Sequence, residues 1–363
     1  MRTMQSALKR HPELKPAPKS SRTLAQQFAP EPRNSLGALM RTMGPFNAVE
    51  SGFAFSNSDS GGWAITDADA AIVSQRFTNF VRPVADAAME PLKKALDEIR
   101  VNINPTNVAP AVQVGIPGVL VEPVIAKALE TALQKLTDTL IAQIPGRYGR
   151  CGGMAFAGLD LYLAGWPVKG FGSTAPGDGP LRKYIFDRLL DSLDLNAGKF
   201  MHFSMVLHIL PLISRAATAA LGAVALSAGG PIGMAIGALI GSQVDLLKLG
   251  GQSPVRDMTR DHWNMLKQHL DAQAAWPIGL VYSDSANPID QHQILALDYT
   301  DPGSGVVTLS VWDNNDRNQA QKWAIDFRGA GLAVSGAANA RPVAAIICEE
   351  YSYKKPPDVL RLS

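Results

Sequence analysis

The sequence predicts an α+β fold in which a mostly apolar helix, beginning at a cysteine, packs on an antiparallel sheet. Helical apolar spacing appears directly after Cys151, through Met154, Ala157 and Leu161. Three β-rich runs follow further along the chain, at 277–282, 292–299 and 306–313. Together these patterns predict a helical part that carries Cys151 and a sheet that carries the downstream polar residues.

The composition limits the class of protein. Of the 363 residues, 46% are hydrophobic and 18% are charged, which permits a sizeable core and excludes global disorder. The formal net charge of +2 is too small to indicate nucleic acid as the main partner, so none is expected. The two cysteines, Cys151 and Cys348, are too few for a disulfide scaffold or a Cys-rich zinc site. They suit a reducing compartment, or chemistry at one of them, and no metal or cofactor is expected.

The N-terminal part separates into two regions. Residues 1–63 are predicted to be a flexible basic and polar segment. The first 33 residues hold seven Lys or Arg against two Glu, a local charge of +5, together with five prolines. No apolar core of a secretory signal occurs before residue 34, so synthesis in the cytoplasm is expected, and delivery outside the cell by a dedicated system stays open. Recurring apolar residues predict a helical region over 64–144.

Cys151 stands at or just before the first turn of the predicted helix, which Gly165 and Pro167 are expected to end. At that place the unpaired backbone N–H groups and the helix dipole favour thiolate over thiol. Gly152 and Gly153 carry no side chains that would block an approaching carbonyl group. The alternative interpretation of Cys151 is a small residue buried at a helix start.

His292 and Asp313 are predicted to face each other across a hairpin. The residues 301–304 read Asp-Pro-Gly-Ser and suit a type II turn; centred between Pro302 and Gly303, this turn puts His292 opposite Asp313. Opposite residues share a face, so the carboxylate can reach the imidazole. A bulge or a one-residue slip would reverse that facing. A carboxylate on one ring nitrogen leaves the other free to take a proton from a thiol.

Three motifs resemble the papain-like cysteine peptidases, in particular their C39-like branch. They are Cys-Gly-Gly-Met-Ala-Phe-Ala at 151–157, His-Gln-Ile-Leu-Ala-Leu-Asp-Tyr at 292–299 and Val-Trp-Asp-Asn-Asn at 311–315. The resemblance covers roughly 145–358 and implies a papain-like catalytic domain there, interrupted by an apolar insertion at about 203–248 and followed by a tail at 359–363. It also implies that Cys151 is the nucleophile, His292 the general base and then acid, and Asp313 the residue that orients the histidine.

The sequence departs from the family at one place. Papain-like enzymes usually carry a glutamine shortly before the cysteine, which helps to hold the oxyanion. Here Pro145 stands six residues before Cys151, and the nearest glutamine is Gln143. The oxyanion is therefore expected to rest on the Cys151 backbone N–H and on a donor that the sequence does not identify.

The resemblance implies a peptidase that hydrolyses amide bonds of a protein or peptide through a thioester, and an effector or toxin role fits delivery outside the cell. Two alternatives stay open: an amidase or acyltransferase with a non-protein substrate, and a non-catalytic membrane-active protein that works through the insertion. Loss of function in Cys151→Ala would indicate an enzyme, and retained function would indicate the membrane-active protein. The sequence identifies no inhibitory partner.

The insertion contains a long uncharged stretch, residues 216–244. Its glycines recur every four residues and would line one face of a helix, at Gly229, Gly233, Gly237 and Gly241. Pro231 is expected to break that helix, and the piece after it rises about 21 Å at 1.5 Å per residue, short of a roughly 30 Å bilayer core. A buried helical hairpin is therefore predicted, with membrane contact through 216–244 as the alternative.

Liposome flotation distinguishes the two states of this hairpin. The wild type is expected to stay with the soluble fraction at neutral and acidic pH, and Gly237→Asp is expected to unfold the protein, because it places a charge in a packed apolar interface. Flotation of the wild type that Gly237→Asp abolishes would overturn the buried hairpin.

Overall fold

The computed structural model describes residues 43–57, 66–76, 149–209, 211, 252–287, 290–336 and 341–361. The predicted segments 1–33 and 216–244, and most of 64–144, lie outside these ranges. Among the described residues no helix is long and apolar enough to cross a membrane. The predictions for the uncharged stretch therefore stay predictions.

The fold is α+β, as predicted, and is built on an antiparallel sheet in the form of a half-barrel. The sheet has six strands: β1 (Trp276–Tyr282), β2 (His292–Thr300), β3 (Val306–Trp312), β4 (Ala320–Asp326), β5 (Ala333–Ser335) and β6 (Val343–Cys348). Their spatial order is β5-β4-β3-β2-β1-β6, and every neighbouring pair is antiparallel. Thus β1 and β2, which the sequence predicts from their apolar runs, occupy the interior of the sheet.

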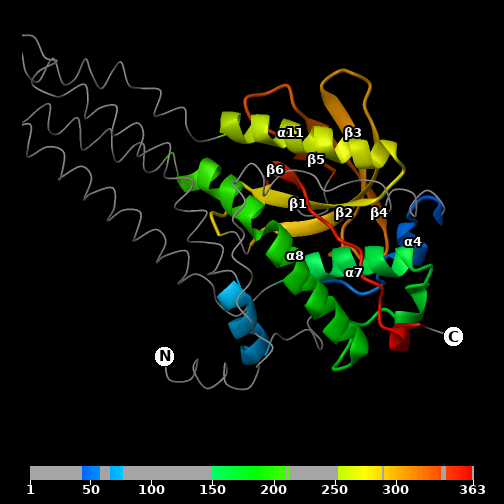
Figure 1. Cartoon of the computed structure of the whole chain (residues 1–363). Helices are drawn as coiled ribbons and strands as arrows, with labels where there is room; N and C mark the ends of the chain where they lie inside the picture. The colour runs from blue at the N-terminus through cyan, green and yellow to red at the C-terminus, as the bar shows by residue number, and fades with distance from the viewer. Residues whose placement is uncertain are drawn as a thin grey trace, which may run out of the picture.

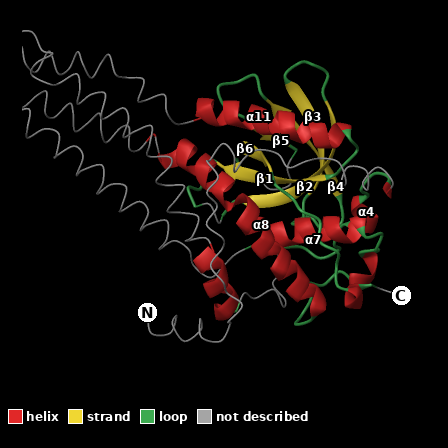
Figure 2. Cartoon of the chain, in the orientation of Figure 1, coloured by secondary structure: helices red, strands yellow, loops and turns green. Residues whose placement is uncertain are grey.

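Helices cover this sheet. The longer ones are α7 (Cys151–Leu163), α8 (Pro180–Ser204) and α11 (Gln252–Asp271), and α4 (Ala48–Ser51) is a single turn. Short helical segments follow α7, α8 and β6: η2 (Lys169–Phe171), η3 (Met205–Ile209) and η5 (Asp358–Leu360). α7 packs on α8 and β2, whereas α11 packs mainly on β6. In the views of Figures 1 and 2 the strands lie between α11 and the pair of α7 and α8.

The cysteine helix begins and ends where the sequence predicts. Cys151 is its first residue, and Gly165, just past its last turn, has φ +68°, a conformation that glycine adopts without strain. The N–H of Gly165 donates to Tyr162 O at 2.9 Å and the N–H of Trp166 to Leu161 O at 2.9 Å. These bonds satisfy the last carbonyl groups of α7, so the helix ends in a Schellman-type cap.

The register of the β2–β3 hairpin differs from the prediction. Thr300 pairs with Thr308, because the connection is longer than a two-residue turn, and a bulge between Ala296 and Asp298 then shifts the ladder by one residue. Leu295 consequently pairs with Trp312. Near His292 the observed register differs from the predicted one by two residues. Because side chains alternate between the two faces of the sheet with a period of two, each residue near His292 still lies on the predicted face.

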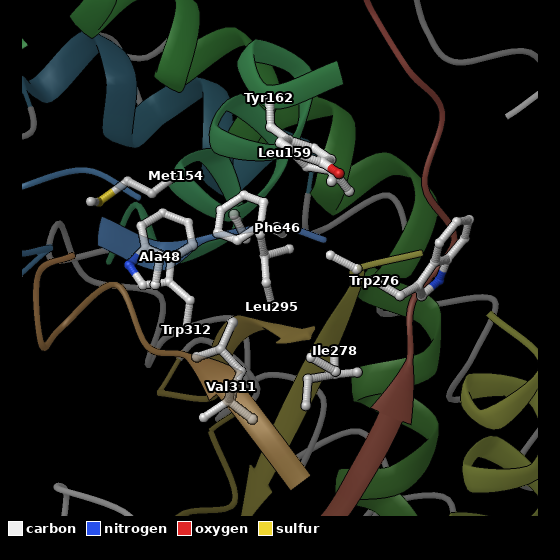
Figure 3. Close-up of a cluster of buried hydrophobic side chains, with 14 of the residues drawn as sticks. Phe46, Ala48, Met154, Leu159, Tyr162, Trp276, Ile278, Leu295, Val311 and Trp312 are labelled. Carbon is white, nitrogen blue, oxygen red and sulfur yellow. The ribbon is translucent and has the colours of Figure 1, made fainter. Parts of the chain in front are cut away.

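The segment 43–57 is not a flexible tail, although it lies within the range 1–63 that the composition predicts to be flexible. Phe53 and Phe55 are completely buried and lie 4.9 Å apart by ring centroid. Phe46 contacts the rings of Tyr162 and Trp312 at 5.2 and 5.8 Å (Figure 3). Three aromatic side chains in one short stretch bury enough apolar surface to order it against α7 and β3.

α7 and α8 approach each other closely at Gly153. A Cβ atom at this position would lie 2.1 Å from the backbone oxygen of Ile185, and a backbone atom cannot rotate away as a side chain can. In an unhindered helix, Gly→Ala stabilises by about 1 kcal/mol. At Gly153 the clash outweighs that gain.

We expect Gly153→Ala to lower the free energy of unfolding by about 1–3 kcal/mol, the usual cost of overpacking a core. Chemical denaturation measures this change. Gly177→Ala is the matched control, because a Cβ there meets nothing within 4 Å and its stability should stay close to that of the wild type. A Gly153→Ala protein more stable than the wild type would contradict the close contact between α7 and α8.

Candidate active site

The structure brings the three predicted site residues together. Cys151 is the first residue of α7, His292 is the first residue of β2, and Asp313 directly follows β3. His292 Nε2 lies 2.7 Å from Asp313 Oδ1. All three side chains are shielded from solvent, with exposed fractions of 7%, 5% and 1% respectively.

His292 pairs with Asp313 as predicted, but the register of β2 on β3 differs from the predicted register. Continuing the observed ladder past Leu295 and Trp312 would place His292 opposite Asn315, not opposite Asp313. The Asn315 side chain does reach the ring, with its Nδ2 3.1 Å from His292 Nε2, and the Asn315 N–H donates to Asp313 Oδ1 at 2.9 Å. Asp313 and Asn315 thus approach the same ring nitrogen, which leaves Nδ1 as the nitrogen that can exchange a proton with a thiol.

Electrostatic interactions favour a protonated ring at this site. Burial alone would lower the pKa of His292, but the hydrogen bond with Asp313 and the interaction and charge of Cys151 outweigh it and raise that pKa to about 10. Burial would likewise raise the pKa of Asp313, but the hydrogen bond and charge of His292 and the N–H of Asn315 lower it overall. A protonated His292 ring beside the Asp313 carboxylate is therefore the stable state at neutral pH.

Asn314 joins the two halves of the site. Its buried Nδ2 donates to Cys151 O at 3.0 Å and to Gln293 O at 2.8 Å, so one amide group links the first turn of α7 to β2. Such a link holds Cys151 and His292 at a fixed separation, because the three backbone positions move together.

A second buried network lies behind Cys151. Gln293 Nε2 donates to Ser192 Oγ and to Glu349 Oε1, each at 2.6 Å. Gln293 also fills the space against the helix, since a Cβ on Gly152 would lie 1.7 Å from Gln293 Oε1. Burial raises the pKa of Glu349 to about 8, partly opposed by its hydrogen bond from Gln293. A buried polar side chain that is bonded to α8 and to Glu349 therefore packs against the first turn of α7.

The segment 43–57 borders the other side of the site. The Asn57 N–H donates to Asn314 O at 2.9 Å, and the Ser56 hydroxyl donates to Asn315 O at 2.8 Å. Asn57 Oδ1 accepts the N–H of Arg150, the residue before Cys151, at 2.6 Å. This segment therefore contacts both the aspartate-bearing loop and the start of α7.

Sequence reasoning missed these supporting residues. Three of them lie beside His292 or Asp313, within the motifs that carry the family resemblance: Gln293, Asn314 and Asn315. Their position in the sequence could therefore have identified them as site residues. Asn57 had no such signal, because 93 residues separate it from Arg150. Pro145 and Gln143, where the family would place an oxyanion donor, lie outside the described residues.

The second cysteine has a structural position. Cys348 is the last residue of β6 and is completely enclosed. Burial raises the pKa of its thiol to about 12. The Cys348 N–H donates to His262 Nδ1 at 3.2 Å. Within the described ranges, no group of three or more His, Cys, Asp or Glu side chains is placed to hold a metal ion.

Comparisons with protein-family models, with curated proteins and with solved structures find no match for this chain.

Proposed function

We propose that this protein is a cysteine hydrolase, a papain-like peptidase of the C39-like kind, that cleaves amide bonds through a thioester on Cys151. The observation that carries the proposal is the 2.7 Å bond between His292 and Asp313 beside a cysteine at the start of a buried helix. A nucleophile, a base and a group that orients the base are the minimum set for this chemistry.

The reaction follows from the charges of the site. The Cys151 sulfur attacks the amide carbon, a C–S bond forms, and the carbonyl electron pair moves to oxygen. The protonated His292 gives its proton to the amine as the C–N bond breaks, which leaves a thioester. Neutral His292 then takes a proton from water, the resulting hydroxide displaces the thiolate, and the acid product leaves. Asp313 keeps the ring oriented and balances its charge throughout.

The arrangement of elements supports the papain-like form of the proposal. The nucleophile comes from a helix that packs on an antiparallel sheet; the histidine begins β2, and the aspartate directly follows the adjacent strand β3. The proposed substrate is a protein or peptide, and an effector or toxin role is proposed with it.

A peptide library tests the activity. We expect the wild type to cleave a mixture of proteome-derived peptides, with new N-termini identified by mass spectrometry, and Cys151→Ala to produce none, because it lacks the nucleophile. Cys348→Ala is the matched control and should retain cleavage, since this thiol is enclosed in β6. Cleavage that persists in Cys151→Ala would contradict the proposal.

Alkylation tests the state of the thiol independently of any substrate. At pH 6 we expect iodoacetamide to label Cys151 about 100-fold faster than Cys348, because Cys151 lies at the start of a helix beside the protonated ring of His292, while burial raises the pKa of Cys348 to about 12. His292→Ala should remove most of that difference. Peptide mapping of the labelled protein measures both rates.

Equal labelling of the two cysteines in the folded wild type would contradict the assignment of Cys151 as nucleophile. Selective labelling without cleavage of any peptide would contradict a peptidase, and would favour the amidase or acyltransferase with a non-protein substrate.

A further inference from the structure

The proposed reaction needs a donor that the three site residues do not supply. When the sulfur attacks, the carbonyl oxygen gains a negative charge, and hydrogen-bond donors aimed at that oxygen lower the barrier. The backbone N–H of Cys151, at the start of α7, is one such donor. We infer that the side-chain amide of Asn57 is the second, an assignment that rests on the proposed function.

The orientation of the Asn57 amide is set by its neighbours. Its Oδ1 accepts the Arg150 N–H at 2.6 Å, which identifies the other amide atom as the nitrogen. That Nδ2 lies 3.3 Å from Asn315 Oδ1, a bond that uses one of its two hydrogens. Among the described residues no further bond engages the second hydrogen, so the amide can donate to a substrate without losing a contact.

The Asn57 amide and the nucleophile border the same small space. The point where a Cβ of Gly149 would stand lies 3.0 Å from Asn57 Nδ2 and 3.7 Å from Cys151 Sγ. Since Gly149 has no side chain, no atom of its own separates the amide nitrogen from the sulfur. A carbonyl group attacked by the sulfur in this space would direct its oxygen to within reach of Nδ2, which is the geometry an oxyanion donor requires.

The position of Asn57 is held at short range. Its own N–H donates to Asn314 O at 2.9 Å, and Asn314 in turn bonds the backbone of Cys151. The donor is thus attached to the same loop that carries Asp313, so donor, nucleophile and histidine are tied through Asn314. Preorganisation of this kind is what makes an oxyanion donor effective, because no reorientation is needed as the charge forms.

Two probes of Cys151 separate this role from a structural one. p-Nitrophenyl acetate acetylates a thiol through an oxyanion: a C–S bond forms, the carbonyl electron pair moves to oxygen and returns, and p-nitrophenolate leaves. Iodoacetamide alkylates the same thiol by displacing iodide from a saturated carbon, and no oxyanion forms. Single-turnover release of p-nitrophenolate and peptide mapping of the alkylated protein measure the two rates in the full chain, with Cys151→Ala as the background.

We expect Asn57→Ala to slow acetylation of Cys151 by about 100-fold, the usual effect of losing one oxyanion donor. Alkylation of Cys151 should change by no more than about twofold, since its transition state needs no such donor. Asn57→Asp keeps the oxygen that accepts the Arg150 N–H but loses the donor, so it should slow acetylation at least as much as Asn57→Ala does. Because it also sets a carboxylate oxygen against Asn315 Oδ1, we expect its melting temperature to fall. Asn318→Ala is the matched control, because Asn318 Nδ2 also holds this segment, through Val49 O at 3.2 Å, and both rates should stay unchanged.

Equal loss of acetylation and alkylation in both Asn57 variants would overturn the assignment, as a merely structural residue would affect both. A wild type that is acetylated at Cys151, with Asn57→Ala acetylated at the same rate, would overturn the assignment and leave the proposed function standing. A wild type that is not acetylated at Cys151 at all would overturn the proposed function and the assignment with it.

Discussion

The architecture depends on the close packing of α7, all thirteen residues of which are buried. A fully buried helix has other elements packed closely against it on every side. The glycines of α7 permit this close packing because they carry no side chains. Gly152 faces Gln293 of β2, Gly153 faces the α8 backbone, and a Cβ on Gly158 would lie 3.0 Å from the Trp312 ring of β3. Contacts from three elements leave the helix no freedom to slide or rotate. The first residue of α7, Cys151, is therefore held beside the ends of the two strands that carry the histidine and the aspartate.

Buried charges at the two ends of α7 serve different purposes. At the N-terminal end, His292 and Asp313 form a pair that leaves one ring nitrogen free for the proposed proton transfer with Cys151. Further along α7, Asp160 is completely buried and is held by Arg188 Nε at 2.6 Å and the Tyr351 hydroxyl at 2.6 Å. Arg188 also donates to Ser352 O at 2.7 Å, so this pair ties the C-terminal segment to α7 and α8. Both pairs are hydrogen-bonded on more than one atom, as buried ions must be to offset their loss of hydration.

The proposed site is assembled from chain segments that are far apart in the sequence. Residues 43–57 contribute Asn57, the start of α7 contributes Cys151, and the β2–β3 hairpin with the loop after it contributes the histidine and the aspartate. Aromatic burial of Phe53 and Phe55 anchors the first of these segments. The packing of this N-terminal stretch therefore bears on the proposed chemistry, because it brings the side-chain amide of Asn57 close to Cys151.

Local sequence determined the elements and the identity of the proposed catalytic residues. Apolar periodicity and the glycine after α7 determine the limits of that helix, and β-rich runs bounded by turn residues determine β1, β2 and β3. Tertiary structure decided the rest. His292 and Asp313 come together because the β2–β3 connection is longer than a two-residue turn and because β2 contains a bulge. The two features shift the strand register in opposite directions, and the turn residues alone do not predict these shifts. Asn57 contacts Arg150, 93 residues further along the chain, because of tertiary packing. Sequence periodicity and motif spacing do not reveal this contact, because it depends on which surfaces bury one another and not on local conformation.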